Sequence, residues 1–422
     1  MIKQLEFKKI ISSPIILGLF VLFLLFNCFL IYEQSSIRND MKSLQPIVKE
    51  TGTLMDEEGR KKLQTSYEQD LHTWNELSQR KTGDTYQTAV DFYKPELYYS
   101  LIESKIYSKE ELQDINKLAI KETYVNSIKE IETKYSTLNV MENAEEGIRL
   151  FGLGGAAAEK VRAQYKALKP RVEELIQNRE HLHLFFHGKM FGTHSFLFKT
   201  LFGFMLFQAM ILIVLFTAFI VNYEFEHKTY LVAYATKRGR RLMWDKLLVS
   251  IFTSTLLTVT LLAMTLSVYF IVFDYSGLWN VPISTGFLIE LNNIPLISWW
   301  NVTFIQYLLM SCSLVVICQI LFVLITFCLS MMIRNSYIVF TLFGVVFLAG
   351  LYIPSLIPKD STMLLYTHFS PFILVMSVKK WWMESGVFTT FKYYEIITVT
   401  GWLLALLLTA WLFIKRFARE NI

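Results

Sequence analysis

The chain alternates between long apolar segments and short charged ones, apart from one long polar stretch in its first half. Six of the apolar segments meet or approach the roughly 20 residues that an α-helix needs to cross a hydrocarbon core about 30 Å thick. These segments are residues 14–32, 200–223, 247–273, 302–329, 335–357 and 394–414. The pattern predicts an all-α polytopic membrane protein with six transmembrane helices.

The distribution of charge orients these helices. Lysine and arginine collect in residues 1–13, 224–246 and 415–422, whereas residues 274–301 contain neither. Short basic segments stay on the cytoplasmic side of a membrane. Six spans place all three basic segments there, so both chain termini are predicted to be cytoplasmic and residues 274–301 to form an outer loop.

One further uncharged run, Ser361–Val378, bears on this topology. It is long enough to suggest a seventh span, but it contains His368, Pro371 and several hydroxyl groups. A seventh span would also send the basic C-terminus outside. Because broken helices are tolerated at membrane depth when they do not face lipid, residues 358–393 are predicted to form a re-entrant or interfacial segment on the outer side.

The first 13 residues place isoleucines and a leucine among lysines, which predicts a short cytoplasmic helix in the membrane interface; a frayed basic tail fits the same pattern. The apolar run that follows, residues 14–32, is longer than the core of a typical signal peptide. No small-residue cleavage pattern comes after it. An uncleaved first helix is therefore expected.

The polar stretch, residues 33–199, is long enough for one domain. It holds 24 Lys and Arg against 26 Asp and Glu, and none of the four cysteines. Ser108-Lys-Glu-Glu111 is a capping box that predicts a helix start, another helix is expected from Ala156 with a kink at Pro170, and no period-2 alternation indicates a sheet. We predict an extracellular helical domain that is stabilised by core packing rather than by disulfides.

Motifs for enzymatic chemistry are missing from the sequence. No segment matches the phosphate-binding pattern G-x-x-x-x-G-K-[ST], and Gly152, Gly154 and Gly155 lack the Lys-Ser/Thr pair. Hydrolase motifs such as G-x-S-x-G and H-E-x-x-H are absent as well. We therefore expect no catalytic residues and no bound cofactor. The basic excess belongs to the membrane part, where it meets lipid headgroups, so no nucleic-acid partner is expected.

Histidines form the one candidate metal cluster, with four of the seven in residues 181–194. His183 and His187 are four residues apart, so on a helix they would share a face and could chelate a divalent metal. No cysteine or carboxylate stands at ligand spacing. The pattern favours interfacial side chains beside phenylalanines, with His183 and His187 as the alternative metal pair.

The most unusual connection is residues 224–246, with six Lys and Arg, two Glu, one Asp and one His between two apolar segments. The rule that positive loops stay inside explains the basic residues but not Glu224, Glu226 and Thr229. Acidic residues, an apolar and aromatic stretch, and then a basic cluster describe a short amphipathic helix. Such a helix can dock in a groove of a soluble partner and transmit motion to it.

This connection resembles the first cytoplasmic loop in the permease subunits of type-2 ATP-binding-cassette exporters. The order Glu-x-Glu-His-x-Thr, a hydrophobic stretch, and then basic residues that open the next span carries the likeness, together with the six spans. The matching positions are Glu224, Glu226, His227, Thr229, Arg240 or Arg241, and Lys246. The chain departs from the family pattern at Lys228, where glycine is usual, and at residues 237–238, where a proline often stands.

The resemblance implies that two permeases, alike or different, form a dimer and that each rests a coupling helix on a cytoplasmic ATPase subunit that binds ATP and Mg²⁺. The contact helix would comprise Leu231 to Thr236, including Tyr234, with Glu224 and Glu226 supporting its base. Residues Arg238 to Arg241 would pair with acidic groups of the ATPase or with lipid headgroups.

An interior of Phe, Leu, Ser and Thr without intramembrane charge is typical of a path for hydrophobic or amphipathic cargo, such as a peptide, lipid or drug. A polar segment without cysteine is typical of a bacterial cell surface. The alternative is a membrane-embedded sensor or scaffold, whose extracellular helical domain binds a ligand and whose inner loop signals to a soluble partner.

Overall fold

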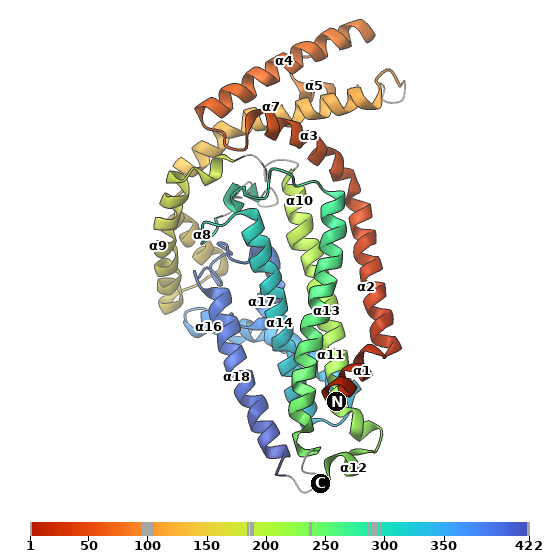
Figure 1. Ribbon diagram of the computed structural model, residues 1–422. Coiled ribbons are helices and arrows are strands. Elements are labelled where there is room, and N and C mark those ends of the chain that lie inside the picture. Colours follow the sequence, from red (N-terminus) through yellow and green to blue (C-terminus); the bar gives the residue numbers. More distant parts are fainter. Residues whose placement is uncertain are drawn as a thin grey trace.

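The computed structural model describes residues 2–94, 105–183, 185, 190–235, 239–285, 287–288, 294–295 and 297–419. Six helical segments in this part of the chain are long and apolar enough to cross a membrane. Their main helices are α2 (Pro14–Glu33), α11 (Phe202–Glu226), α13 (Leu242–Val272), α14 (Phe304–Met332), α15 (Ser336–Tyr352) and α18 (Tyr394–Phe417). The architecture is that of an all-α polytopic membrane protein, as the hydrophobic pattern predicts (Figure 1).

The bundle is organised around α14, which packs against α11, α13, α15 and α18. The side chains of residues 321–324 of α14 have no exposed surface, because neighbouring helices surround them. By contrast, few residues in the most apolar stretches of α2, α15 and α18 are buried. This arrangement is expected when lipid covers the outside of a helix bundle.

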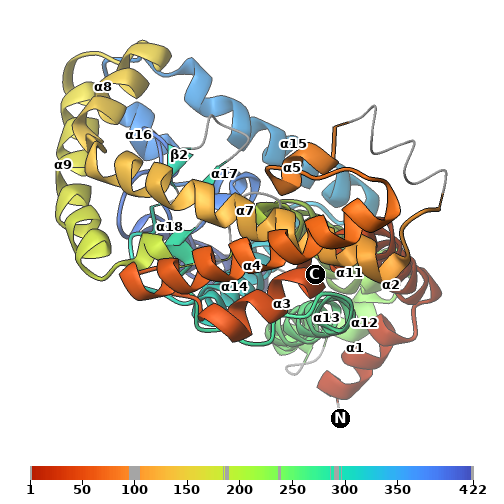
Figure 2. The same cartoon turned by 90° about the horizontal axis from the view of Figure 1, so that it is seen from above.

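A helical insert, residues 37–182, covers one end of the bundle, which we call the insert end. Its helices are α3 (Ile37–Thr51), α4 (Glu57–Lys81), α5 (Ala89–Phe92), α7 (Lys109–Ser136), α8 (Val140–Phe151) and α9 (Gly155–Gln177). In Figures 1 and 2, α3, α4 and α7 lie across this end, whereas α8 and α9 run alongside the bundle.

Local sequence signals set the boundaries of the insert helices. The predicted capping box is confirmed, since Ser108 and Glu111 exchange side-chain and backbone hydrogen bonds at the start of α7. Gly152 ends α8 in the left-handed conformation that glycine adopts without strain. Helix α9 begins at Gly155, one residue before the prediction, and continues through Pro170 to Gln177.

The opposite end of the bundle, which we call the loop end, carries α1 (Ile2–Ile11), α12 (Tyr230–Tyr234) and the C-terminal end of α18 (Figure 1). Helix α1 packs against α2, α11 and α13 and buries Glu6 and Ile10. It is therefore part of the bundle rather than a frayed tail.

Between α15 and α18 the chain forms two short helices, α16 (Met363–Thr367) and α17 (Pro371–Met376). Helix α17 contacts α11, α14, α15 and α18. The run Ser361–Val378 is therefore not one continuous helix. The strands in the described part of the chain are β1 (Phe287–Leu288) and β2 (Ile294–Pro295), a two-residue antiparallel pair at the insert end.

Helix α9 is tied to the insert end of the bundle by hydrogen bonds. The Arg171 guanidinium forms two hydrogen bonds with the Glu180 carboxylate, at 2.9 and 2.7 Å, and its Nε donates to the Ser298 carbonyl at 3.0 Å. The Tyr165 hydroxyl donates to the Glu384 carboxylate at 2.6 Å. These contacts fix α9 against the loops that precede α14 and α18.

Candidate coupling site

Helix α11 continues to Glu226 and α13 begins at Leu242, so both helices extend into the segment 224–246. Glu224 and Glu226 lie in the last turn of α11, and Lys246 lies in the second turn of α13. These charged side chains are buried or hydrogen-bonded, which lets both helices extend.

The chain reverses direction at Lys228 and then forms the single helical turn of α12. Lys228 has φ = 58°, in the left-handed region that glycine adopts without strain. A lysine there costs roughly 1 kcal/mol or more. The backbone N–H of Thr229 donates to the Glu224 carbonyl at 2.9 Å and so closes the turn.

Glu224 is the centre of a buried ionic network. Its carboxylate pairs with the Lys246 ammonium, whose side chain has no exposed surface. The Lys9 ammonium lies 3.1 Å from the same carboxylate and 2.7 Å from the Glu6 carboxylate. The Tyr234 hydroxyl donates a hydrogen bond to the Glu224 carboxylate at 3.2 Å. One carboxylate on α11 therefore accepts hydrogen bonds from α1, α12 and α13.

The network alters the titration of its members outside the spanning helices. Burial lowers the pKa of Lys9, but the hydrogen bond to Glu6 and the charge of Glu224 outweigh that effect, so the pKa is raised overall. Burial and the neighbouring Glu224 charge raise the pKa of Tyr234. Lys9 stays charged and Tyr234 stays a hydrogen-bond donor at neutral pH.

Aromatic contacts attach α12 to further helices. The Tyr234 ring lies 5.1 Å from that of Phe417 at the end of α18, and Phe225 stacks on Tyr230 at 5.4 Å. Glu226 accepts a 2.6 Å hydrogen bond from the backbone N–H of Ser336, which opens α15. The base of α12 is thus connected to five helices of the bundle: α1, α11, α13, α15 and α18.

His227 also holds this corner, because its ring stacks on Tyr223 at 4.1 Å and its Nδ1 hydrogen-bonds the Tyr223 carbonyl at 2.9 Å. The Lys9 ammonium lies 4.1 Å from the centre of the Tyr223 ring. Sequence reasoning missed Glu6 and Lys9, because nothing in the chain marks residues so far from Glu224 as its neighbours. It also missed Tyr223, whose position four residues before His227 was a local signal for their contact.

The remaining face of α12 is apolar and unpaired. Leu231 is 57% exposed and Val232 is 80% exposed. Figure 1 shows α12 projecting from the loop end of the bundle. One side of α12 is attached to the buried ionic network, and its other side exposes apolar side chains. Such a turn is suited to contact another protein.

Some predicted coupling residues fall outside this description. Thr236 and Arg238 lie outside the described residues, and for Arg240 only the backbone is described. Arg241 is exposed and immediately precedes α13. Gly239 lies so close to α12 that a Cβ atom there would be 1.8 Å from the Ala233 carbonyl oxygen. Glycine is therefore required at this close approach.

The candidate metal pair is not supported in its predicted geometry. His183 has extended backbone, forms a β-bridge with Leu54 and hydrogen-bonds the Thr53 hydroxyl at 3.2 Å, so the helical i, i+4 spacing does not apply. His187 lies outside the described residues. Within the described part of the chain, no three potential ligands come together to hold a metal ion.

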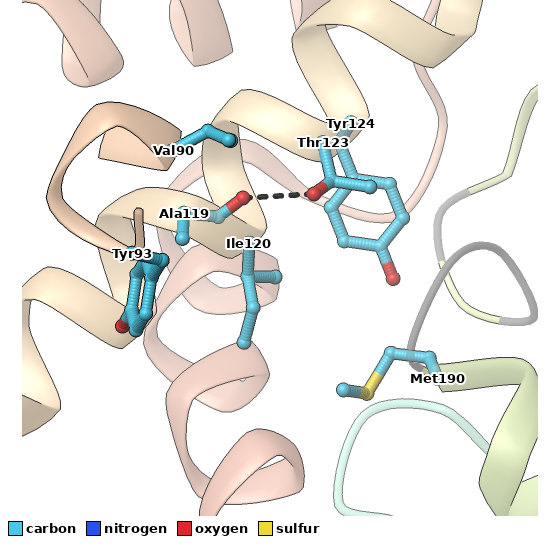
Figure 3. Close-up of a pocket in the computed structure, with 7 residues that line it drawn as sticks. All are labelled: Val90, Tyr93, Ala119, Ile120, Thr123, Tyr124 and Met190. Carbon is cyan, nitrogen blue, oxygen red and sulfur yellow. Dashed lines mark hydrogen bonds between the residues drawn. The ribbon is translucent and has the colours of Figure 1, made fainter. Parts of the chain in front are cut away.

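A second feature of interest is a cavity of about 270 Å³ in the insert. Its lining is mainly apolar and comes from α5, α7 and the residue before α10 (Phe191–Ser195) (Figure 3). The lining residues are Val90, Tyr93, Ala119, Ile120, Thr123, Tyr124 and Met190. Thr123 and Tyr124 direct their hydroxyls to backbone carbonyls, so the wall presents little free polarity.

Comparisons with protein-family models, with curated proteins and with solved structures find no match for this chain.

Proposed function

We propose that this chain is the membrane-spanning subunit of an ATP-driven exporter, with α12 as the helix that contacts a separate ATPase subunit. The observation that carries the proposal is the exposed apolar turn at Leu231 and Val232, which a hydrogen bond from Tyr234 to Glu224 attaches to the bundle. Burial of two such side chains against a partner contributes on the order of 1–2 kcal/mol each. A rigid base lets the partner's movement reach the bundle rather than bend the loop.

The geometry supports a particular route for this movement. A partner that moves α12 would act on Tyr234 and therefore on the Glu224 carboxylate. The same carboxylate is bonded to Lys246 and Lys9, so α1, α11 and α13 would move together. In this proposal the chain itself hydrolyses no ATP, and both ATP and Mg²⁺ belong to the partner.

The rest of the assignment follows from the basic segments and the exposed helices. The loop end is proposed to be cytoplasmic and the insert extracellular, with residues 358–393 as a re-entrant or interfacial segment on the outer side of the membrane. Exposed apolar side chains of α15, such as Tyr337 and Leu348, would face lipid or a second permease. The cargo is proposed to be hydrophobic or amphipathic.

The proposal is tested by placing a photo-crosslinking amino acid at position 232 in cells. The expected product is a crosslink to a protein that has its own phosphate-binding loop and whose ATPase activity depends on this chain. Changing Leu231 and Val232 together to Asp should abolish the stimulation, whereas Ile106→Asp, an exposed apolar site in the insert, should not. A crosslink to a kinase, or no crosslink at all, would refute the exporter.

The cavity in the insert favours a second candidate, a sensor whose extracellular domain binds an apolar ligand. Its apolar lining between Ile120 and Met190 would suit an alkyl or aromatic group (Figure 3). The crosslinked partner separates the two candidates. A sensor requires a signalling protein at Val232, and its cavity-filling variant Ala119→Trp should lose the response without any effect on ATP hydrolysis.

A further inference from the structure

The tip of the α8–α9 hairpin, residues 149–154, exposes two apolar side chains, Leu150 and Phe151, although one edge of Phe151 contacts the Phe388 ring at 4.8 Å. Along α8, Val140, Ala144 and Ile148 recur every four residues and are buried. Leu150 and Phe151 follow this buried stripe, yet they are 75% and 42% exposed. An isolated exposed leucine is ordinary, but an exposed pair at the end of a hairpin marks a contact surface when its location identifies what covers it.

The location of the hairpin tip is fixed by hydrogen bonds to the chain just after α15. The backbone N–H of Gly154 donates to the Lys359 carbonyl at 3.2 Å, and that of Ala157 donates to the Asp360 carbonyl at 3.1 Å. The apolar segment that contains α15 ends at Leu356, three residues before Lys359. The tip therefore lies at the level where this spanning segment leaves the membrane.

The direction of the hairpin agrees with this level. Figure 1 shows α8 and α9 running from the rest of the insert toward the loop end, beside the bundle, as far as α16. Figure 2 shows α8 and α9 at the edge of the molecule, on the same side as α16. The hairpin therefore points along the bundle axis, with its tip beside the end of the α15 segment.

The neighbourhood of the tip is also exposed and apolar. Ile353 and Leu356 at the end of the spanning segment are exposed, as are Met363 and Tyr366 of α16, which contacts α9. Exposed apolar side chains are therefore found on the end of the α15 segment, on α16 and at the hairpin tip. The exposed Lys359, next to Gly152, is positioned to keep its ammonium among lipid phosphates while its stem lies along apolar surface.

We propose that the hairpin tip inserts Leu150 and Phe151 into the lipid leaflet at the insert end. The insert is then anchored to the membrane as well as to the bundle. The ligand class is phospholipid, bound through its acyl region by two apolar side chains and at its headgroups by Lys359. The inference needs only a membrane-spanning bundle and does not depend on the proposed exporter function.

The test uses the full chain in nanodiscs of phosphatidylcholine and phosphatidylglycerol, with an environment-sensitive fluorescent amino acid at position 150. Lipids that carry a quencher near the top of the acyl chain should reduce its emission at least twofold more than at position 146. Glu146 is exposed one turn earlier on the same helix and serves as the matched control. Aqueous iodide should show the opposite order.

Three results would overturn the proposal. Equal lipid quenching at positions 150 and 146 would show that the tip stays in water. Position 150 could instead be shielded from both quenchers, with the shielding lost when the chain is diluted in detergent. That result would show that the tip contacts a second copy of the chain rather than lipid. A Leu150→Glu variant that keeps the wild-type elution profile should lose the lipid quenching of a probe at position 151, and retention of that quenching would also contradict the anchor.

Discussion

Replacing Glu224 by Gln removes the negative charge at the centre of the loop-end network and leaves its shape nearly unchanged. The Lys246 ammonium, which has no exposed surface, then faces only neutral acceptors: the carbonyls of Ile220 and Val221 and the amide oxygen of the new glutamine. Removing one partner of a buried ion pair costs about 3–5 kcal/mol, because the other charge remains desolvated. We expect Glu224→Gln to lower the free energy of unfolding by about that amount.

The reverse change should be milder because the network is asymmetric. In Lys246→Met, the Glu224 carboxylate still accepts hydrogen bonds from Lys9 and Tyr234. The expected cost is about 1–3 kcal/mol. In the double variant neither charge is left alone in the bundle, so its loss of stability should fall short of the sum of the two single losses by about 2 kcal/mol.

The assay is equilibrium unfolding of the purified chain in mixed detergent micelles, followed by tryptophan fluorescence, for the wild type, both single variants and the double variant. A matched control is Glu58→Gln, which breaks an exposed pair with Lys62 and should leave the free energy of unfolding unchanged within measurement error. Additive losses within about 0.5 kcal/mol, or a larger loss for Lys246→Met than for Glu224→Gln, would refute the network as described.

Three further outcomes are expected. Gly239→Ala should displace α12, because the new Cβ would lie 1.8 Å from the Ala233 carbonyl oxygen. The bundle should stay folded but lose its contact with the partner, and unchanged crosslinking at position 232 would contradict this. Asn27→Leu should lower the free energy of unfolding by about 1–2 kcal/mol, because it leaves the buried Gln208 amide unpaired. Changing Gln208 to Leu as well should recover part of this loss, measured by unfolding in micelles. Burial lowers the pKa of His181 below its ordinary value, so the neutral form is favoured in the folded protein. Melting curves should therefore show stability falling as the pH drops below about 6.5, and falling less steeply in His181→Phe. Equal slopes for the two proteins would exclude this role.

The six spanning segments were predictable because a helix of about 20 apolar residues matches the thickness of the hydrocarbon core, and soluble proteins rarely contain so long an uncharged run. The start of α7 was predictable for a similarly local reason, since Ser108 and Glu111 satisfy backbone groups within one turn. In both cases the physical cause lies within a short stretch of sequence.

The loop-end network was not predictable in this way. Glu224 and Lys246 are 22 residues apart, and Lys9 is 215 residues from Glu224. A charge near the end of an apolar run reads as a solvated loop residue unless its partner is known. The antiparallel register of α11 and α13 supplies that partner, and only the folded structure reveals it. His183 illustrates the same limit, because a bridge to Leu54 overrides its helical spacing.

The helices that carry the loop-end network also reach the insert end of the bundle. One continuous helical segment runs from Phe191 at the insert end to Glu226 at the loop end and contains a π-helical turn at Phe196–Leu201. Asn27 bonds both Gln208 of α11 and Thr265 of α13, so α2 follows these two helices. Because α2 leads directly into α3 of the insert, a displacement that enters at α12 must either reach the insert or be absorbed on the way. The π-helical turn, where the regular hydrogen-bond ladder is interrupted, is the place in this segment where we expect such a displacement to be absorbed.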